Sequence, residues 1–195
     1  MLQLSGTQIH SPRQRQQGLA RAAEGIARAV DGLELKSGGL TLLIENTAGA
    51  EFSLGSTFEQ VAELVAMLKP ILPVAACIDT CHIHVAGYDI LSEEGYELTL
   101  KHLDQTVGLK NVPVWHCNDA KAAHGSKLDR HQHIGEGTIG PEPFRRLLND
   151  ARTSHAAFIA ETPIDEPGDD LRNVEALKKL VKGSPQSSKG SSRTK

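Results

Sequence analysis

The chain has 195 residues, a formal net charge of −3, 39% hydrophobic and 23% charged residues, which is the composition of a soluble globular domain. No apolar run approaches the ~18 residues of a membrane helix, and the N-terminus lacks the pattern of a secretory signal. Three cysteines are too few and too odd in number for a disulfide framework, so we expect an intracellular, reducing compartment. The net negative charge argues against nucleic-acid binding, although bound metal ions would add positive charge that this count omits.

Helical and strand patterns alternate along the chain. In chain order the sequence predicts a helix at 14–30, a strand at 40–44, a helix at 56–68, a strand at 74–78, a helix at 92–107, a strand at 112–115, a helix at 141–150, a strand at 156–160 and a helix at 171–181. Pro113 is disfavoured inside a strand, so the third strand is expected to begin there. One helix followed by four strand–helix units predicts an α/β fold with a parallel sheet.

A residue that can bind a metal ion closes each predicted strand. These residues are Glu45, Asp79, His116 and Glu161. The C-terminal ends of parallel strands line the active sites of α/β proteins. A single acid at such a position is ordinarily a helix cap or a solvated residue, but capping does not explain a metal-ligand type at the end of every strand. The pattern therefore predicts a metal site.

Two nearby segments add further ligands of the same kinds. His82 follows Asp79 by three positions, and His131 follows Asp129 by two, so each pair can face one pocket. Imidazole and carboxylate ligands without thiolate are typical of Zn²⁺, Mn²⁺ or Fe²⁺ in a hydrolytic site. Grouped ions of this kind bind phosphate, activate water and stabilise a leaving oxygen.

The other histidines and two of the cysteines are interpreted as structural residues. Cys77 and Cys81 are expected to be buried, inert thiols. Surface positions or supporting positions near the ligands are expected for His84, His102, His124, His133 and His155. Of these, His133 is the best candidate to support a ligand.

Several segments together resemble the signature segments of the endonuclease IV family, also called AP endonuclease family 2. They are IENTAG (44–49), IDTCH (78–82), AGYD (86–89), HCNDAK (116–121), DRHQHIGEGTIG (129–140) and ET (161–162). The resemblance runs from about residue 19 to residue 180. It implies a TIM (β/α)8 barrel with three zinc ions that cleaves double-stranded DNA 5′ to abasic sites. Residues 1–182 would form the C-terminal part of such a barrel, with about four βα units.

The resemblance also implies roles for single residues. Glu45 would bridge two metal ions and act in catalysis together with Glu161. One zinc ion would be completed by Asp79, His116 and Glu161, and another would be held by His82, Asp129 and His131. Mn²⁺ is a possible substitute for zinc. Arg130 and Lys121 are the candidate DNA contacts, while Gly135, Gly137 and Gly140 are expected to shape the turn into the next helix.

The chain departs from the family pattern at its N-terminal end. The two histidine ligands of the family's third zinc ion have no counterpart here. His10 lies nearest to their place in the pattern, but it matches a histidine of the family that is not a ligand. We therefore expect two zinc sites. Four or five strands cannot close an eight-stranded barrel, so open apolar edges are also expected.

The segment 183–195 is rich in Ser, Gly and Lys and is expected to be disordered. It is either a solvated tail or a segment for nuclear targeting or DNA-phosphate contact. Three functions stay open: an AP endonuclease, a sugar isomerase or epimerase on a related barrel, and a non-catalytic zinc- or DNA-binding remnant. The nuclease would act in the nucleus or mitochondrion of a eukaryote, or in the cytoplasm of another organism.

Overall fold

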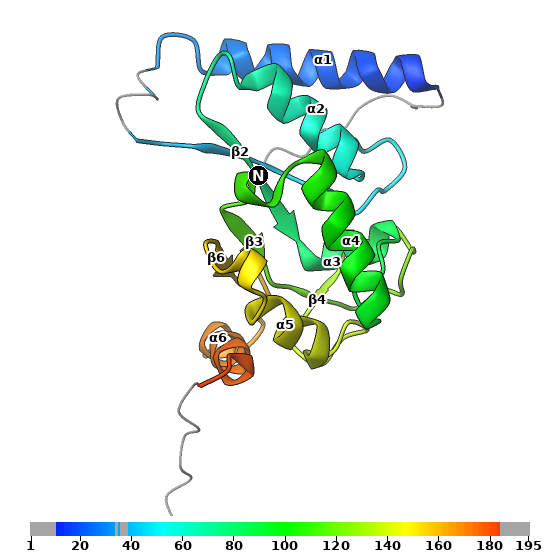
Figure 1. Cartoon of the computed structure of the whole chain (residues 1–195), viewed down its shortest axis with the longest axis vertical. Coiled ribbons are helices and arrows are strands. Elements are labelled where there is room, and N and C mark those ends of the chain that lie inside the picture. The colour runs from blue at the N-terminus through cyan, green and yellow to red at the C-terminus, as the bar shows by residue number, and fades with distance from the viewer. Residues whose placement is uncertain (1–10, 34, 36–38, 184–195) are drawn as a thin grey trace, which may run out of the picture.

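The computed structural model of the chain describes residues 11–33, 35 and 39–183 (Figure 1). Its helices are α1 (Pro12–Ala29), α2 (Phe58–Leu68), α3 (Thr80–Ala86), α4 (Glu93–Thr106), α5 (Pro141–Leu148) and α6 (Asp169–Leu180). Its strands are β1 (Leu42–Glu45), β2 (Val74–Asp79), β3 (Val114–His116), β4 (Asp119–Ala120), β5 (His131–Gln132) and β6 (Ala157–Ile159). Short 3-10 turns lie at Leu109–Asn111 and Ala151–Thr153.

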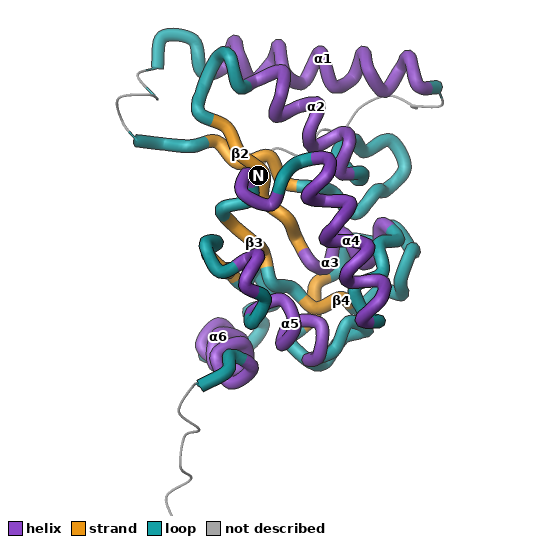
Figure 2. The backbone as a smooth tube through the Cα atoms, in the orientation of Figure 1, coloured by secondary structure: helices purple, strands orange, loops and turns teal. Residues whose placement is uncertain are grey.

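Four of these strands form one parallel sheet in the order β1-β2-β3-β6. The register places Glu45 beside Cys77 and Asp79 beside His116, so the strand-end residues meet at the same edge of the sheet. Strands β4 and β5 form a separate antiparallel pair. Figure 2 shows the sheet strands in the middle of the molecule, between α1 and α2 at one end and α6 at the other. The predicted alternation of strands and helices is confirmed.

Local sequence signals begin four of the helices within two residues of the predicted starts. In α1, Ser11 and Gln14 form a capping box, which satisfies backbone N–H groups at both ends of the first turn. Thr57 caps α2, and Ser92 caps α4. Pro141 occupies the first turn of α5, where its missing N–H is not needed. Each of these residues stabilises a helix that the apolar spacing alone would leave without a defined start.

The hydrophobic core has two parts. The larger part surrounds β2 and β3 and includes the fully buried side chains of Ile78, Trp115 and Phe144. The smaller part lies between α1, α2 and β1, and Leu19 and Leu68 are among its buried residues. Burial of one such side chain contributes about 1.5–3 kcal/mol. Both parts pack against strands of the sheet.

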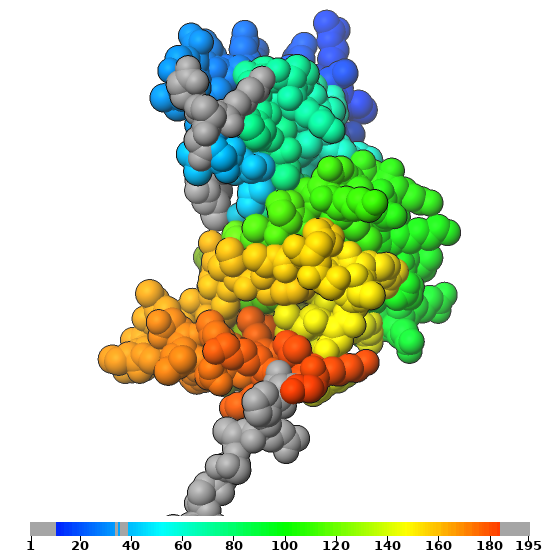
Figure 3. Space-filling model, turned by 60° about the vertical axis from the view of Figure 1, so that its left-hand side comes forward, coloured from blue at the N-terminus to red at the C-terminus, as the bar shows by residue number. Residues whose placement is uncertain are grey.

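The two outer strands of the sheet have one partner each within the described residues. Ile159 on β6 is 45% exposed, and the residues of β1 are half-buried. Figure 3 shows a hollow in the outline of the molecule, between its blue and cyan segments and the orange segment. A four-stranded sheet with two open edges agrees with the expectation of a partial barrel.

Two short elements were not predicted. Helix α3 follows β2 directly because the Asp79 side chain accepts a hydrogen bond from His82 N and caps the helix. The β4–β5 pair forms where two motif segments that are separated in the sequence come together in the fold. His10 and residues 184–195 of the predicted tail lie outside the described residues. The described helices are too short or too polar to span a lipid bilayer.

Candidate metal centre

Seven side chains gather at the carboxyl ends of the parallel strands and form two sets whose ligand atoms lie within 4.8 Å of one another. The four-residue group consists of Glu45, Asp79, His116 and Glu161. The three-residue group consists of His82, Asp129 and His131. All seven are residues that the sequence predicts as metal ligands. The structure brings them together, and their binding of a metal ion stays a prediction.

The four-residue group has His116 at its centre. Its Nδ1 atom lies 3.0 Å from Glu45 Oε1, 3.0 Å from Glu161 Oε2 and 3.9 Å from Asp79 Oδ2. Burial lowers the pKa of His116, but the hydrogen bond and charge of Glu45 and the charge of Glu161 outweigh burial and raise it. Burial also raises the pKa of Asp79, which is completely enclosed. Three carboxylates around one imidazole are a donor set that a divalent cation fits.

In the three-residue group, backbone carbonyls determine which ring nitrogens carry hydrogen. His82 Nδ1 lies 2.8 Å from Asn46 O, and His131 Nδ1 lies 2.9 Å from Glu161 O. A carbonyl only accepts, so both Nδ1 atoms are assigned the hydrogen, and in the neutral form of each ring the Nε2 atom carries the lone pair that can bind an ion. These buried Nε2 atoms form no hydrogen bond within the described residues. They lie 3.2 and 3.4 Å from the two oxygens of Asp129, so the three side chains can share one ion.

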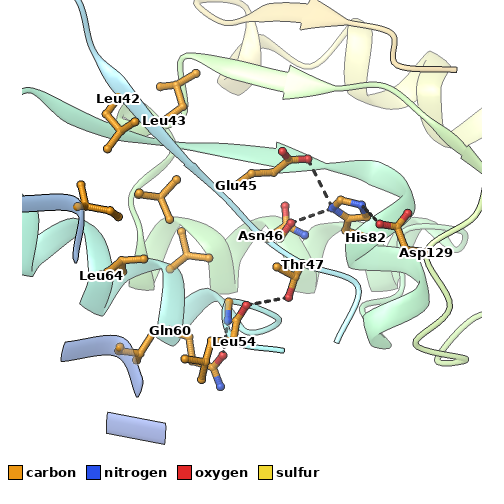
Figure 4. A pocket seen from close by; sticks show the side chains of 15 residues that line it. Leu42, Leu43, Glu45, Asn46, Thr47, Leu54, Gln60, Leu64, His82 and Asp129 are labelled. Atoms are coloured by element: carbon orange, nitrogen blue, oxygen red, sulfur yellow. Dashed lines mark hydrogen bonds and ion pairs between the residues drawn. The ribbon is translucent and has the colours of Figure 1, made fainter. Parts of the chain in front are cut away.

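The carboxylates around His82 favour the protonated form of its ring. Burial lowers the pKa of His82, but Asp129 and Asp79 outweigh burial and raise it to about 9. Figure 4 shows the His82 ring between Asn46 and Asp129, with Glu45 close to the same ring. A cation bound here must displace that proton, as is general for metal sites built from histidine.

The two groups adjoin each other. Glu45 Oε1 is 3.0 Å from His116 Nδ1 and 3.5 Å from His82 Nδ1, so this carboxylate lies between them. Asp79 Oδ2 is 3.8 Å from His131 Nε2 of the other group. Two ions held here would be close neighbours, and a carboxylate between them is suited to contact both.

Two buried asparagines, for which the sequence analysis predicted no role, hold the candidate ligands in place. Asn118 donates from Nδ2 to Asp79 Oδ2 at 2.5 Å and accepts at Oδ1 from Glu161 N at 2.7 Å. Asn46 accepts at Oδ1 from Asp79 N at 2.8 Å. Both lie inside the quoted motif segments, which was the only available signal. Such hydrogen bonds fix the direction of ligand side chains.

The two candidate DNA contacts come from the β4–β5 region. Lys121 and Arg130 are both exposed, and Lys121 N donates to Arg130 O at 2.8 Å. This bond places both residues beside β5, which begins with His131. The structure therefore brings two cationic side chains to the segment that carries a candidate ligand. Their contact with DNA stays a prediction.

The residues interpreted as structural lie as follows. The three cysteines are free and buried, as was predicted for Cys77 and Cys81. Burial raises the pKa of Cys81 to about 12, so it remains a thiol even though it lies near Asp79 and His131. His133 accepts at Nδ1 from Asn173 Nδ2 at 2.9 Å and belongs to neither group. This contact supports the loop after β5.

A cavity of about 180 Å³ adjoins the three-residue group. Leucine and isoleucine side chains from α1, β1 and α2 line its apolar part, and Glu45, His82 and Asp129 also border it. Figure 4 shows Leu42 and Leu64 on the apolar side of this space. The metal-ligand candidates thus border the open edge of β1.

Fold and site together define a parallel α/β protein with a candidate metal centre at its strand ends. Residues 1–182 match the model of the family described as xylose isomerase-like TIM barrel, and the chain belongs to this family. The predicted fold class, a partial TIM barrel, is thereby confirmed.

Similar proteins support the predicted resemblance to endonuclease IV. The probable endonuclease 4 of Solibacter usitatus is 48% identical over 145 residues, which cover 73% of this chain and 50% of that protein. The one from Chloroflexus aurantiacus is 42% identical over 167 residues, covering 85% and 58%. The chain thus spans about half the length of these relatives.

Solved structures agree with the same assignment. The crystal structure of endonuclease IV from Thermus thermophilus is 37% identical, with a TM-score of 0.69, and the match covers 83% of this chain and 57% of that chain. A putative xylose isomerase from Rhodospirillum rubrum, 22% identical with a TM-score of 0.59, supports the fold alone. The resemblance to the endonuclease IV family is confirmed.

Proposed function

We propose that the chain is a zinc-dependent AP endonuclease that hydrolyses the phosphodiester bond 5′ to an abasic site in double-stranded DNA. The observation that carries the proposal is the pair of adjoining ligand groups, in which backbone carbonyls contact Nδ1 of His82 and of His131 and both Nε2 atoms face Asp129. The names of the relatives, endonuclease 4 and endonuclease IV, support it. Nitrogen and carboxylate ligands favour zinc, with Mn²⁺ as a substitute.

The roles of the chain's own residues follow from their exposure and neighbours. Zinc bound in both groups would supply a Lewis acid for the phosphate and lower the pKa of a bound water molecule. Glu45, with a side chain only 16% exposed, is held between the groups and would bridge them. The Glu161 side chain is 43% exposed, so it can reach a water molecule entering from solvent and accept its proton.

Substrate binding would depend on the exposed cations beside the site. Arg130 offers a planar group of donors for a phosphate, and Lys121 offers a point charge. The chain would act in a compartment that holds DNA: the nucleus or mitochondrion of a eukaryote, or otherwise the cytoplasm.

Two other functions each have one observation in their favour. A sugar isomerase or epimerase agrees with the family description and with the fold of the Rhodospirillum rubrum protein. A non-catalytic zinc- or DNA-binding role agrees with the fact that the chain spans only about half the length of its relatives. Two adjoining ligand groups favour the nuclease, because an isomerase needs fewer ligands.

The deciding experiment is incubation of the zinc-loaded chain with a duplex that contains one abasic site. We expect a nick on the 5′ side, formed more slowly than by an endonuclease IV of full length, and no nick in the undamaged duplex. His116→Ala should reduce the rate by at least about 100-fold. His155→Ala is the matched control, since His155 contacts Leu109 O outside both groups. Ketose turnover without nicking would indicate the isomerase, and zinc binding without either reaction would indicate the non-catalytic role.

A further inference from the structure

Asp119 is a completely buried carboxylate outside both metal-ligand groups. It lies in the HCNDAK segment, where the sequence offers no role for it. Backbone N–H groups surround it. Oδ1 accepts from Ala120 N at 2.8 Å and from Ile139 N at 2.9 Å, and Oδ2 accepts from Gly135 N at 2.9 Å, Gly137 N at 3.1 Å and Gly140 N at 3.2 Å.

This arrangement makes the loop after β5 depend on one side chain. A buried carboxylate is costly unless strong donors compensate for its lost hydration, and an array of backbone N–H groups does so. Four of the five donors come from residues 135–140, so the loop is wrapped around Asp119. Loss of the charge would leave several buried N–H groups without their acceptor.

The glycines of the IGEGTIG segment fit this role. A Cβ atom at Gly137 would collide with Asp119 Oδ1 and with Ala120 O. Gly135 and Gly140 have φ values of +83° and +71°, a region that side chains with a Cβ atom rarely adopt. The absence of side chains at these positions lets the backbone approach the carboxylate from three directions.

The anchored loop is continuous with β5, which carries the candidate ligand His131 and begins two residues after Asp129. Asp119 pairs with Gln132, and Ala120 pairs with His131, in the β4–β5 ladder. Thr138 N also donates to Ala120 O at 2.8 Å. The segment 129–140 is thus held at one end by Asp119, while Asp129 and His131 lie at its other end.

We propose that Asp119 is a positioning residue for the three-residue group. Its carboxylate fixes the loop 133–140 against β4, and through the β4–β5 pair it sets Asp129 and His131 opposite His82. The part of this inference that concerns metal rests on the proposed function. The part that concerns the loop does not.

The test compares Asp119→Asn with Asp89→Asn. Asparagine keeps the shape of aspartate but replaces one acceptor oxygen with a donor. Asp89 is the matched control, because it also accepts backbone N–H groups, from Leu91 and Ser92, and also packs closely against a glycine, Gly95. It belongs to neither ligand group. The measurements are amide hydrogen exchange and zinc affinity by competition with a chelator.

We expect D119N to exchange faster at residues 133–140 and to bind one of two zinc ions about 10–100-fold more weakly. The other zinc ion should be unaffected, and D89N should leave the exchange of 133–140 and both affinities unchanged. If D119N does not fold, Gly137→Ala serves as the second variant. It displaces the same loop while keeping the carboxylate, so it should show the faster exchange and the weaker zinc binding expected of D119N. Unchanged exchange at 133–140, or equal weakening of both zinc ions, would overturn the inference. A wild-type chain without zinc would contradict the proposed function, and the exchange would then still decide whether Asp119 anchors the loop.

Discussion

Replacement of Asn118 by alanine should weaken the fold and the zinc site together. The side chain is completely buried, and it joins the ends of two strands by contacting Asp79 Oδ2 and Glu161 N. Alanine removes both hydrogen bonds without adding bulk. The variant therefore leaves one buried carboxylate oxygen and one backbone N–H group without these partners.

The size of the effect follows from those two groups. Each polar group left unsatisfied in the interior costs about 1–3 kcal/mol, so N118A, which affects two such groups, should lose about 2–6 kcal/mol of unfolding free energy. With a urea m-value of about 2 kcal/mol/M, the unfolding midpoint should fall by about 1–3 M. The hydrogen bond to Asp79 also orients a candidate ligand, so zinc affinity at the four-residue group should fall by about 10–100-fold.

Urea unfolding followed by circular dichroism, together with zinc titration, measures both effects. Asn111→Ala is the control: it makes the same change at an exposed asparagine whose side chain donates to Val107 O. Its midpoint should move by less than about 0.5 M. If N118A keeps the wild-type midpoint and zinc affinity, the assignment of Asn118 as a support for Asp79 and Glu161 is wrong.

Three further predictions concern other parts of the molecule. His131→Ala should leave one zinc ion per chain where the wild type binds two, as metal analysis would show; loss of both would mean that the groups are not separate sites. Gly137→Ala should lower the unfolding free energy by more than about 2 kcal/mol. Gly25 lies on a helix with open space for a Cβ atom, so Gly25→Ala should raise the unfolding free energy by up to about 1 kcal/mol. Equal urea midpoints for the two variants would contradict this. Burial raises the pKa of Asp150, but hydrogen bonds and charge from Arg152 outweigh burial and lower it below 3.8. Ionised Asp150 therefore stabilises the fold fully at pH values above the ordinary pKa, and this stabilisation is lost as the pH falls through the lowered pKa. The difference in urea midpoint between wild type and Asp150→Asn should therefore shrink below about pH 4. A constant difference would be evidence against the ion pair of Asp150 with Arg152.

The main helices and strands could be predicted from local sequence patterns. Apolar spacing, cap residues such as Ser92 and the position of Pro113 depend on neighbours within a few residues, so they can be read without tertiary structure. The strand-end residues could be predicted to lie together for a related reason: a parallel sheet brings the ends of its strands to one edge, whatever the details of packing. Glu45, Asp79, His116 and Glu161 are therefore predictable as a set.

Long-range contacts set the limit of that reasoning. Helix α3 forms because Asp79 acts as a cap as well as a candidate ligand, and the two roles cannot be separated in the sequence. Asn118 and Asp119 are polar residues after a strand, and only the structure shows what contacts them. The assigned tautomer of His82 depends on the carbonyl of Asn46, which is distant in sequence. Such roles come from pairs of segments that meet only in the fold.

The most direct measurement for the central claim is the zinc content of the purified wild-type chain. After equilibration with zinc and removal of the excess by dialysis, elemental analysis should find two zinc ions per chain, one for each ligand group. A chain that retains no zinc would contradict the account.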